Sequence, residues 1–274
     1  MKKSQIDQEA RSVNGVKITQ SEFDYMGSIT IDKKIMEASG FLPFQKIYIH
    51  DIDNGQHLWT YAIEGDAGTG IICLNGSIAR KVTVPDTLKL HTAMRVSEDT
   101  ADEAKKGIVT VSNGNKTVIT QQAAVLPQHD VEMLHSKIHC ATVHYAEDIP
   151  NEYIVIGQKL RKAAGLHDGQ RVDIYNKTGG KRYTATVKAG EQEGMFISPH
   201  GTDARKIRNK DIVILCAYTS MDYEQAKTHK PPLVFVDKEN NVKKVDHPKT
   251  EPVHLLGVAN KSQQSGNFIA QSKL

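Results

Sequence analysis

The chain repeats itself once along its length, and this repeat constrains the fold more than any other feature of the sequence. Residues 16–90 and 141–215 align without a gap at one constant offset. Because the period is long, the repeat predicts two whole domains rather than the small stacked units of a solenoid. The aligned positions include Ile29 with Ile154, Ala38 with Ala163, Gly40 with Gly165, Gly55 with Gly180, Gly76 with Gly201, Asp86 with Asp211, and Ala79-Arg80-Lys81 with Ala204-Arg205-Lys206.

The length of the chain allows each copy to have a core of its own. A total of 274 residues is enough for two modest domains. We expect the first copy at residues 12–120, a linker at 121–132 and the second copy at 133–246. The remaining segment, 247–274, has few apolar pairs, which is typical of a peripheral tail.

Short alternating segments dominate both copies. The stretches IYIHDI (47–52) and VDIYNK (172–177) alternate apolar and polar residues and are followed by Asn-Gly or Gly-Gly, which indicates hairpins. KKIMEASG and QKLRKAAG are short helical stretches that end in glycine. Many short strands with few helices favour a small β-barrel or sandwich over a doubly wound sheet.

Charge and cysteine content exclude several classes of protein. A formal net charge of +3, spread evenly, does not indicate a nucleic-acid partner. Cys73, Cys140 and Cys216 have no metal-ligand spacing, and their odd number favours free thiols in a reducing, cytoplasmic compartment. We therefore predict no metal site. No apolar run is long enough to cross a bilayer, and the start MKKSQIDQEA lacks a signal core, so we expect no membrane partner.

Three motifs of the first copy carry a family resemblance. They are YMGSITID (25–32), WTYAI (59–63) and CLNGSIARK (73–81). Alone, the Gly-Ser pair would indicate a tight turn before a strand. Together, at these distances, the motifs resemble the pyruvoyl-dependent aspartate 1-decarboxylase family, and the similarity extends over nearly all of both copies. The resemblance implies a mainly β fold of two tandem double-psi β-barrels with short helices.

The resemblance also implies a chemistry for the first copy. The family cleaves itself at a Gly-Ser bond, here Gly27-Ser28, and the serine becomes a covalent pyruvoyl group. This group forms a Schiff base with L-aspartate, and loss of CO2 gives β-alanine for pantothenate or a specialised pathway. Thr60 matches the family's oxyanion donor and Tyr61 its proton donor, although a strand tyrosine alone would indicate packing. The positions matching the family's polar lining for substrate are Tyr25, Asn75, Gly76 and Ser77.

The second copy lacks the residues of this chemistry. Glu152-Tyr153 stand where the first copy has Gly27-Ser28, so we expect no cleavage there. The other replaced positions are Thr60-Tyr61, which become Ala185-Thr186, and Asn75, which becomes His200.

The second copy keeps the residues that the family uses on the opposite side of its site. Lys137 and His139 match the family's basic N-terminal positions, and Arg182 matches the arginine that binds the side-chain carboxylate. For Lys137 alone, a solvated surface lysine explains the sequence equally well. Tyr175 and Ile214 also match family positions. At the places of Lys137, His139, Tyr175, Arg182 and Ile214, the first copy has Ser12, Asn14, His50, His57 and Lys89, in that order.

This division predicts complementary copies. In the single-copy family the site lies between adjacent barrels of a tetramer, so each copy of a fused chain needs only one side of the interface. Decay of both copies at random would not be expected to remove one complete side from each. The resemblance thus implies a homodimer that forms a pseudo-tetramer of barrels, and some relatives need a helper protein for cleavage.

Two other functions stay open at the level of sequence. His57 and Trp59 depart from the usual first-copy residues, so the enzyme could decarboxylate a different acidic amino acid. Alternatively, the chain could be an uncleaved barrel that acts as a binding or regulatory module. The sequence also leaves open whether a site combines two copies of one chain or of two chains.

Overall fold

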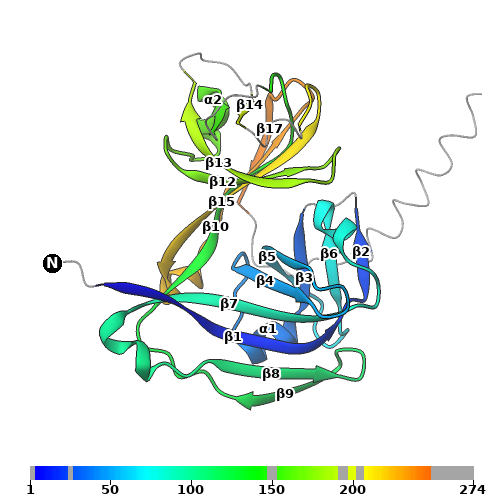
Figure 1. Ribbon diagram of the computed structural model, residues 1–274, viewed down its shortest axis with the longest axis vertical. Coiled ribbons are helices and arrows are strands. Elements are labelled where there is room, and N and C mark those ends of the chain that lie inside the picture. The colour runs from blue at the N-terminus through cyan, green and yellow to red at the C-terminus, as the bar shows by residue number, and fades with distance from the viewer. Residues whose placement is uncertain (1–3, 24–26, 147–152, 191–196, 202–206, 248–274) are drawn as a thin grey trace, which may run out of the picture.

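The computed structural model describes residues 4–23, 27–146, 153–190, 197–201 and 207–247. It is mainly β, as the sequence predicts, and forms two lobes, one for each copy (Figure 1). The lower lobe of that view contains the first copy, and the upper lobe contains most of the second. None of the described helices is long and apolar enough to cross a membrane.

Each copy is built mostly from strands, two of them long, with few helical segments. The first copy contains β1 (Gln5–Lys17), β2 (Gln20–Glu22), β3 (Ser28–Asp32), α1 (Lys33–Ser39), β4 (Lys46–Asp51), β5 (His57–Gly65), β6 (Ile72–Asn75), the 3-10 segment Gly76–Lys81, β7 (Thr87–Ser97), the 3-10 segment Glu98–Glu103, β8 (Gly107–Ser112) and β9 (Thr117–Gln122). The second contains β10 (Asp130–Thr142), β11 (Tyr153–Ile156), α2 (Gln158–Ala163), β12 (Arg171–Asn176), β13 (Arg182–Ala189), β14 (Ile197–His200), β15 (Ile212–Asp222), α3 (Tyr223–Ala226), β16 (Leu233–Val236) and β17 (Val242–Asp246).

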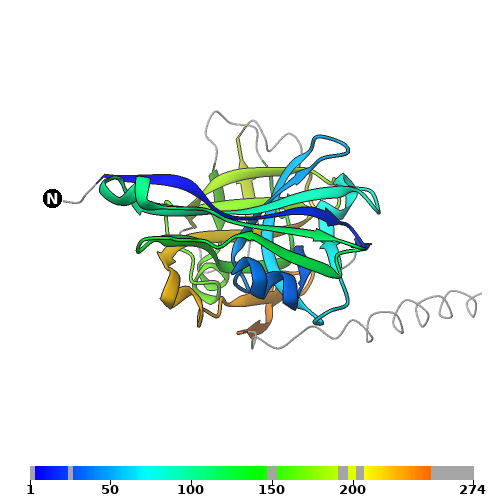
Figure 2. The same ribbon diagram turned by 90° about the horizontal axis from the view of Figure 1, so that it is seen from below.

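The strand pairing is the same in both copies. In the first, β1 pairs with β7 antiparallel and with β8 in parallel; in the second, β10 pairs likewise with β15 and β16. Similarly, β3 lies between parallel β5 and antiparallel β6, as β11 lies between β13 and β14. From below, β1 (dark blue) and β7 run side by side across the molecule (Figure 2). This repeated mixture of pairings agrees with the expected double-psi β-barrel.

Direct contacts join the two copies. At its start β10 pairs with β7, through Asp130 with Arg95 and Val131 with Met94. Each copy has its own buried cluster, and a third cluster lies between them. Burial of this apolar surface stabilises one arrangement of the two lobes. The third cluster includes Phe44 and Tyr61 of the first copy with Met133, Leu134, Tyr175 and Ile214.

A helix cap anchors the strand that begins with Ser28. Asp32 ends β3, and its side chain accepts a hydrogen bond from the Lys34 amide to cap α1. The same carboxylate accepts from the amides of Gly68 and Gly70 in the connection from β5 to β6. One side chain therefore links β3, α1 and the loop beside them, which holds β3 rigidly between its neighbours.

Candidate active site

Ser28 is the first residue of β3 and lies between two neighbouring strands. Its register partner on β6 is Asn75, and the next residue, Ile29, pairs with Ala62 on β5. The Asn75 amide donates hydrogen bonds of 3.0 Å to the hydroxyl oxygens of both Ser28 and Thr30. Ser28 is fully buried, and Gly27 before it is partly buried. The serine hydroxyl is thus held by a side chain next to the bond that the sequence predicts to be cleaved.

Cys73 orients the amide that holds Ser28. Its thiol sulfur lies 3.2 Å from Oδ1 of Asn75, so the thiol can donate there and leave the amide nitrogen to face the two hydroxyls. Burial raises the pKa of Cys73 to about 12, which keeps the donor proton on sulfur. From the sequence, Cys73 is expected only to be a free thiol. The two-residue spacing is the signal that would have linked Cys73 to Asn75, because it places both side chains on the same face of β6.

Tyr61 meets Lys137 of the second copy. The two side chains are almost completely buried, and Nζ of Lys137 donates a 2.9 Å hydrogen bond to the Tyr61 hydroxyl. Burial lowers the pKa of Lys137 to about 8. Tyr61 lies on β5 directly before Ala62, which pairs with Ile29, the residue after Ser28, in the parallel pairing of β3 and β5. The first copy therefore combines with the second copy of its own chain.

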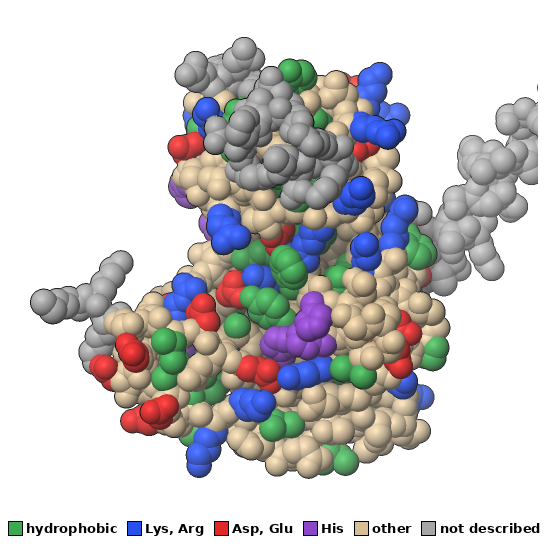
Figure 3. Space-filling view, viewed as in Figure 1, with side chains coloured by type: hydrophobic (Ala, Val, Ile, Leu, Met, Phe, Trp, Pro, Cys, Tyr) green, Lys and Arg blue, Asp and Glu red, His purple; other side chains and the backbone are tan. Residues whose placement is uncertain are grey.

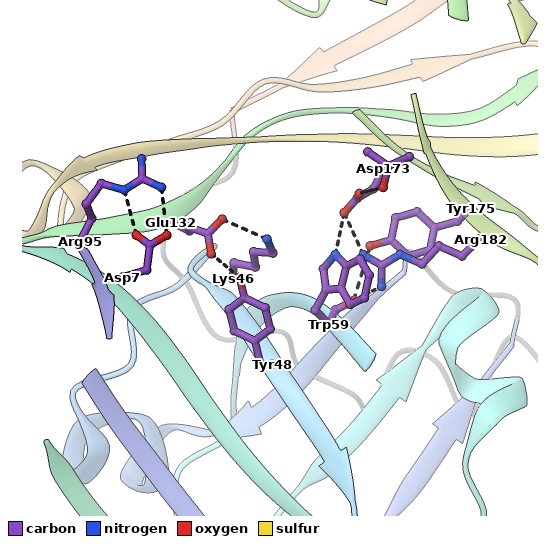
Figure 4. Close-up of polar contacts among 10 residues, drawn as sticks. Asp7, Lys46, Tyr48, Trp59, Arg95, Glu132, Asp173, Tyr175 and Arg182 are labelled. Carbon is purple, nitrogen blue, oxygen red and sulfur yellow. Dashed lines mark hydrogen bonds and ion pairs between the residues drawn. The ribbon is translucent and has the colours of Figure 1, made fainter. Parts of the chain in front are cut away.

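Arg182 makes the second connection between the copies (Figure 4). Its guanidinium donates from Nη1 to the backbone oxygen of Trp59 and from Nη2 to Asp173, both at 2.8 Å. The guanidinium carbon lies 3.3 Å from the centre of the Trp59 ring and 4.6 Å from that of Tyr175. An arginine stacked on aromatic rings and bonded on two sides is held in one orientation.

A cavity of about 400 Å³ opens beside this cluster, between the two lobes. Trp59 and Lys46 line it from the first copy, and Asp173 and Tyr218 from the second. Glu132 forms a 3.0 Å ion pair with Lys46 at its wall. Hydrophobic, charged and histidine side chains gather where the two lobes meet (Figure 3). The described geometry thus places an arginine, a lysine, a tyrosine and a serine around the junction of two complementary surfaces.

Comparison with known proteins shows the family of this chain. The model of a family described as aspartate decarboxylase matches residues 8–118 and, separately, 130–243. The chain belongs to this family. The two matches confirm that it carries two copies of the family's domain in tandem.

Individual proteins of the family each match a stretch of this chain that is about as long as one copy. The aspartate 1-decarboxylase of Clostridium beijerinckii is 44% identical over 98 residues, 36% of this chain and 79% of that protein. That of Desulfotalea psychrophila is 41% identical over 98 residues, 36% of this chain and 82% of the relative. That of Lactiplantibacillus plantarum is 38% identical over 111 residues, 40% of this chain and 85% of the relative.

The other residues expected from the family lie at different distances from this junction. Gly76 adopts a positive φ of 74° directly after Asn75, where glycine is favoured, and begins the buried turn that contains Ser77. Alternation along β5 places Tyr61 on the face that carries Ser28, whereas Thr60 pairs with Ile47 on the opposite face. Tyr25 lies outside the described residues.

His139 packs away from the other expected binding residues. Its ring lies 5.5 Å from that of Phe235, and its Nε2 lies 3.2 Å from the sulfur of Cys140. Burial lowers its pKa to about 3, with a further contribution from the charge of Lys137. The side chain is therefore neutral at physiological pH. In this geometry His139 supports the bulged part of β10 rather than contacting Tyr61 or Arg182.

In the second copy an aromatic stack takes the place of the serine and the amide. Tyr153 and His200 stand where Ser28 and Asn75 stand, and their rings stack with centres 4.6 Å apart. Nζ of Lys188 lies 4.9 Å from the centre of the Tyr153 ring. The second copy therefore has a phenol at this position, where the first copy has the primary alcohol of Ser28.

Proposed function

We propose that this chain is an aspartate 1-decarboxylase, which converts L-aspartate to β-alanine and CO2 with a pyruvoyl group made from Ser28. The observation that carries this proposal is the meeting of two half-sites in one chain. Lys137 donates a hydrogen bond to Tyr61, and Arg182 donates one to Trp59 on the same strand, β5, which pairs with the strand that begins with Ser28. The relatives are themselves named aspartate 1-decarboxylases.

The first step of the proposal is cleavage between Gly27 and Ser28. The Ser28 hydroxyl attacks the Gly27 carbonyl carbon, and the acyl group moves from nitrogen to oxygen. The bond from Asn75 to the hydroxyl supports this step because it restricts the nucleophile's orientation. Loss of the Cα proton then releases Gly27 as a carboxylate and leaves a dehydroalanine, and water replaces its nitrogen, which departs as ammonia.

The surroundings of Ser28 fit the group that would form there. The position is fully buried, and the Asn75 amide supplies a hydrogen-bond donor at 3.0 Å. A neutral carbonyl needs a donor and exclusion of water, and both are present. When formed, the pyruvoyl group supplies a ketone that binds the substrate amine and withdraws electrons from its α-carbon.

Arg182 is proposed to bind the side-chain carboxylate of the substrate. Its Nε is buried and has no hydrogen-bond partner among the described residues. A buried donor without a partner costs free energy, which an acceptor from a ligand would recover. A carboxylate can bind such a guanidinium with two hydrogen bonds, which explains selection of an acidic amino acid.

Tyr61 and Lys137 are proposed to handle the proton. The phenol of Tyr61 would donate to the α-carbon after CO2 leaves. Lys137 donates its own hydrogen bond to the same oxygen at 2.9 Å, so its charge would stabilise the phenolate that results. Because the pKa of Lys137 is lowered to about 8, the ammonium can also return a proton to Tyr61 near neutral pH.

Mass spectrometry of the denatured protein tests this function. We expect a small fragment ending at Gly27 and a large fragment beginning with a pyruvoyl group from Ser28. Ser28→Ala should abolish both cleavage and decarboxylation, whereas Tyr153→Phe, at the matching position of the second copy, should leave both intact. An uncleaved wild-type chain with full activity would rule out the proposal. Cleavage in the protein purified alone would show that no helper is needed.

We further propose that two chains associate in the cytoplasm as a ring of four barrels, with first and second copies alternating. Each chain then holds one site, because only the first copy has a serine at the cleavage position. Light scattering should give twice the chain mass, and carbonyl titration should give one pyruvoyl group per chain. An active monomer would overturn the ring but not the site, since the described half-sites meet within one chain.

A further inference from the structure

Trp59 is the single tryptophan of the chain, and it occupies the strand that carries Tyr61. Its side chain shares the face of β5 that meets the second copy, because residues two apart on a strand point to the same side. The first copy thus presents a large aromatic ring to the second copy from the strand that carries Tyr61.

Three hydrogen bonds join Trp59, Arg182 and Asp173 (Figure 4). The indole Nε1 donates to Oδ2 of Asp173 at 2.8 Å, and Nη2 of Arg182 donates to the same oxygen at 2.8 Å. The backbone oxygen of Trp59 accepts from Nη1 of Arg182, also at 2.8 Å. The ring of Trp59 packs on the guanidinium at 3.3 Å. One residue of the first copy therefore contacts Arg182 by backbone, by ring stacking and through a shared carboxylate.

This arrangement sets the distance between Arg182 and the reaction centre. Trp59 lies two residues before Tyr61, which corresponds to about 7 Å along a strand. Tyr61 precedes Ala62, and Ala62 pairs with Ile29, the residue after Ser28, on the neighbouring strand β3. Arg182 is held by its hydrogen bond to the Trp59 backbone and by packing on the Trp59 ring. Its guanidinium therefore cannot shift along β5 to bind the carboxylate of a longer substrate without breaking these contacts.

We propose that Trp59 is a positioning residue that makes the site select an acidic amino acid by length, taking the four-carbon aspartate in preference to the five-carbon glutamate. This inference rests on the proposed function. Trp59 acts through Arg182 rather than on the reacting atoms. Without the ring and the indole donor, Arg182 would keep its ion pair with Asp173 but could sample more than one position.

Kinetics with two substrates test the proposal. Trp59→Ala should raise KM for aspartate about tenfold, with kcat changed little, because a desolvated cation–π contact and a hydrogen bond are lost. The ratio of kcat/KM for aspartate over glutamate should fall by about tenfold as well. Trp59→Phe keeps a ring on the guanidinium and should restore most of the KM.

Leu58→Ala serves as the matched control. Leu58 is the neighbouring residue of β5 and packs against the core of the first copy instead of the second copy. This variant should lower the temperature of unfolding and leave the substrate ratio unchanged. A Trp59→Ala protein that is cleaved at Ser28 and keeps the wild-type ratio would overturn the proposal.

Ligand binding without catalysis separates this inference from the proposed function. Succinate carries two carboxylates and no amine, so it can be titrated into Ser28→Ala while the fluorescence of Trp59 is followed. We expect a saturable change, which should be absent with butyrate and in Ser28→Ala/Arg182→Ala. If wild type has no decarboxylase activity but succinate gives this response, the proposed function fails and the Trp59–Arg182 site stands. If succinate gives no change in fluorescence, the inference fails. This outcome does not depend on whether the Trp59→Ala variant folds.

Discussion

The first copy keeps a serine at the cleavage position without an arginine for a carboxylate, and the second keeps the arginine without the serine. Their strand pairing and cores are alike, and the differing polar and aromatic residues lie outside the two cores. Ser28 and Asn75 form a hydroxyl–amide pair where Tyr153 and His200 stack their rings. A barrel can therefore exchange its surface chemistry while its core keeps the fold, because the two depend on opposite faces of the same strands.

His57 of the first copy stands at the position that Arg182 occupies in the second copy, and here too the two side chains differ in chemistry. The rings of His57 and His50 are tilted against each other with centres 4.2 Å apart, and the ring of His91 meets that of His50 edge-on at 4.8 Å. Burial lowers the pKa of His50, and it lowers that of His91 to about 4. These two imidazoles are thus neutral at physiological pH. This surface of the first copy does not offer the permanent charge and paired donors of a guanidinium.

The largest expected effect separates Tyr61 from its counterpart Thr186. Tyr61→Phe removes the proposed proton donor and should lower kcat by about 100- to 10,000-fold, the usual contribution of general acid catalysis. Thr186→Val should leave kcat within about twofold, since surface changes remote from the site are usually small. Steady-state kinetics on cleaved protein would check both. Equal losses in the two variants would contradict the division of roles between the copies.

The next effect concerns Lys137, whose counterpart Ser12 carries no charge. Its pKa is lowered from 10.5 to about 8, so between these values the unfolded chain binds a proton that the folded chain has released. The free energy of unfolding should therefore rise with pH in this window, by up to about 3 kcal/mol. Denaturant unfolding at several pH values should show this rise in wild type and in Ser12→Ala but not in Lys137→Met. Parallel pH profiles for all three would show that Lys137 has an ordinary pKa.

Arg182 and His57 test the carboxylate site. Arg182→Ala removes a charge-assisted pair of about 1.5–3 kcal/mol and should raise KM for aspartate at least about tenfold. Cleavage at Ser28 should be unaffected. His57→Ala should change KM by less than about twofold. If His57 mattered more than Arg182, the assignment of the two surfaces would be reversed.

The smallest effect distinguishes two buried residues, Asp51 at the end of β4 and Asn176 at the end of β12. In the first copy, burial and the neighbouring Asp86 carboxyl raise the pKa of Asp51; in the second, Asn176 donates to Asp211 at 2.7 Å. When folding raises the pKa of an acidic group, the free energy of unfolding of the protein falls as pH rises through that pKa. Asp51→Asn should therefore increase the free energy of unfolding at pH 7 by about 1 kcal/mol, and Asn176→Asp should decrease it. Thermal unfolding would measure both, and changes of the same sign would refute the comparison.

Strand alternation and the constant offset of the repeat predicted the mainly β class and the two-copy organisation of the fold from the sequence. Both signals are local, since hairpin residues and apolar spacing act within a few positions. The same offset placed Arg182 against His57 and Tyr61 against Thr186, and so revealed that the copies are complementary. Ser28 beside Asn75 also follows from the family motifs, because both belong to paired strands within one copy.

The sequence by itself therefore determined two mainly β copies of one family domain, with different polar residues retained in each. Only the tertiary structure decided that Lys137 reaches Tyr61 within one chain, that Trp59 holds Arg182, and that His139 turns toward Phe235. These contacts join residues far apart in the sequence across the surface between the lobes. Their geometry depends on how whole sheets pack against each other, which no local pattern of residues specifies.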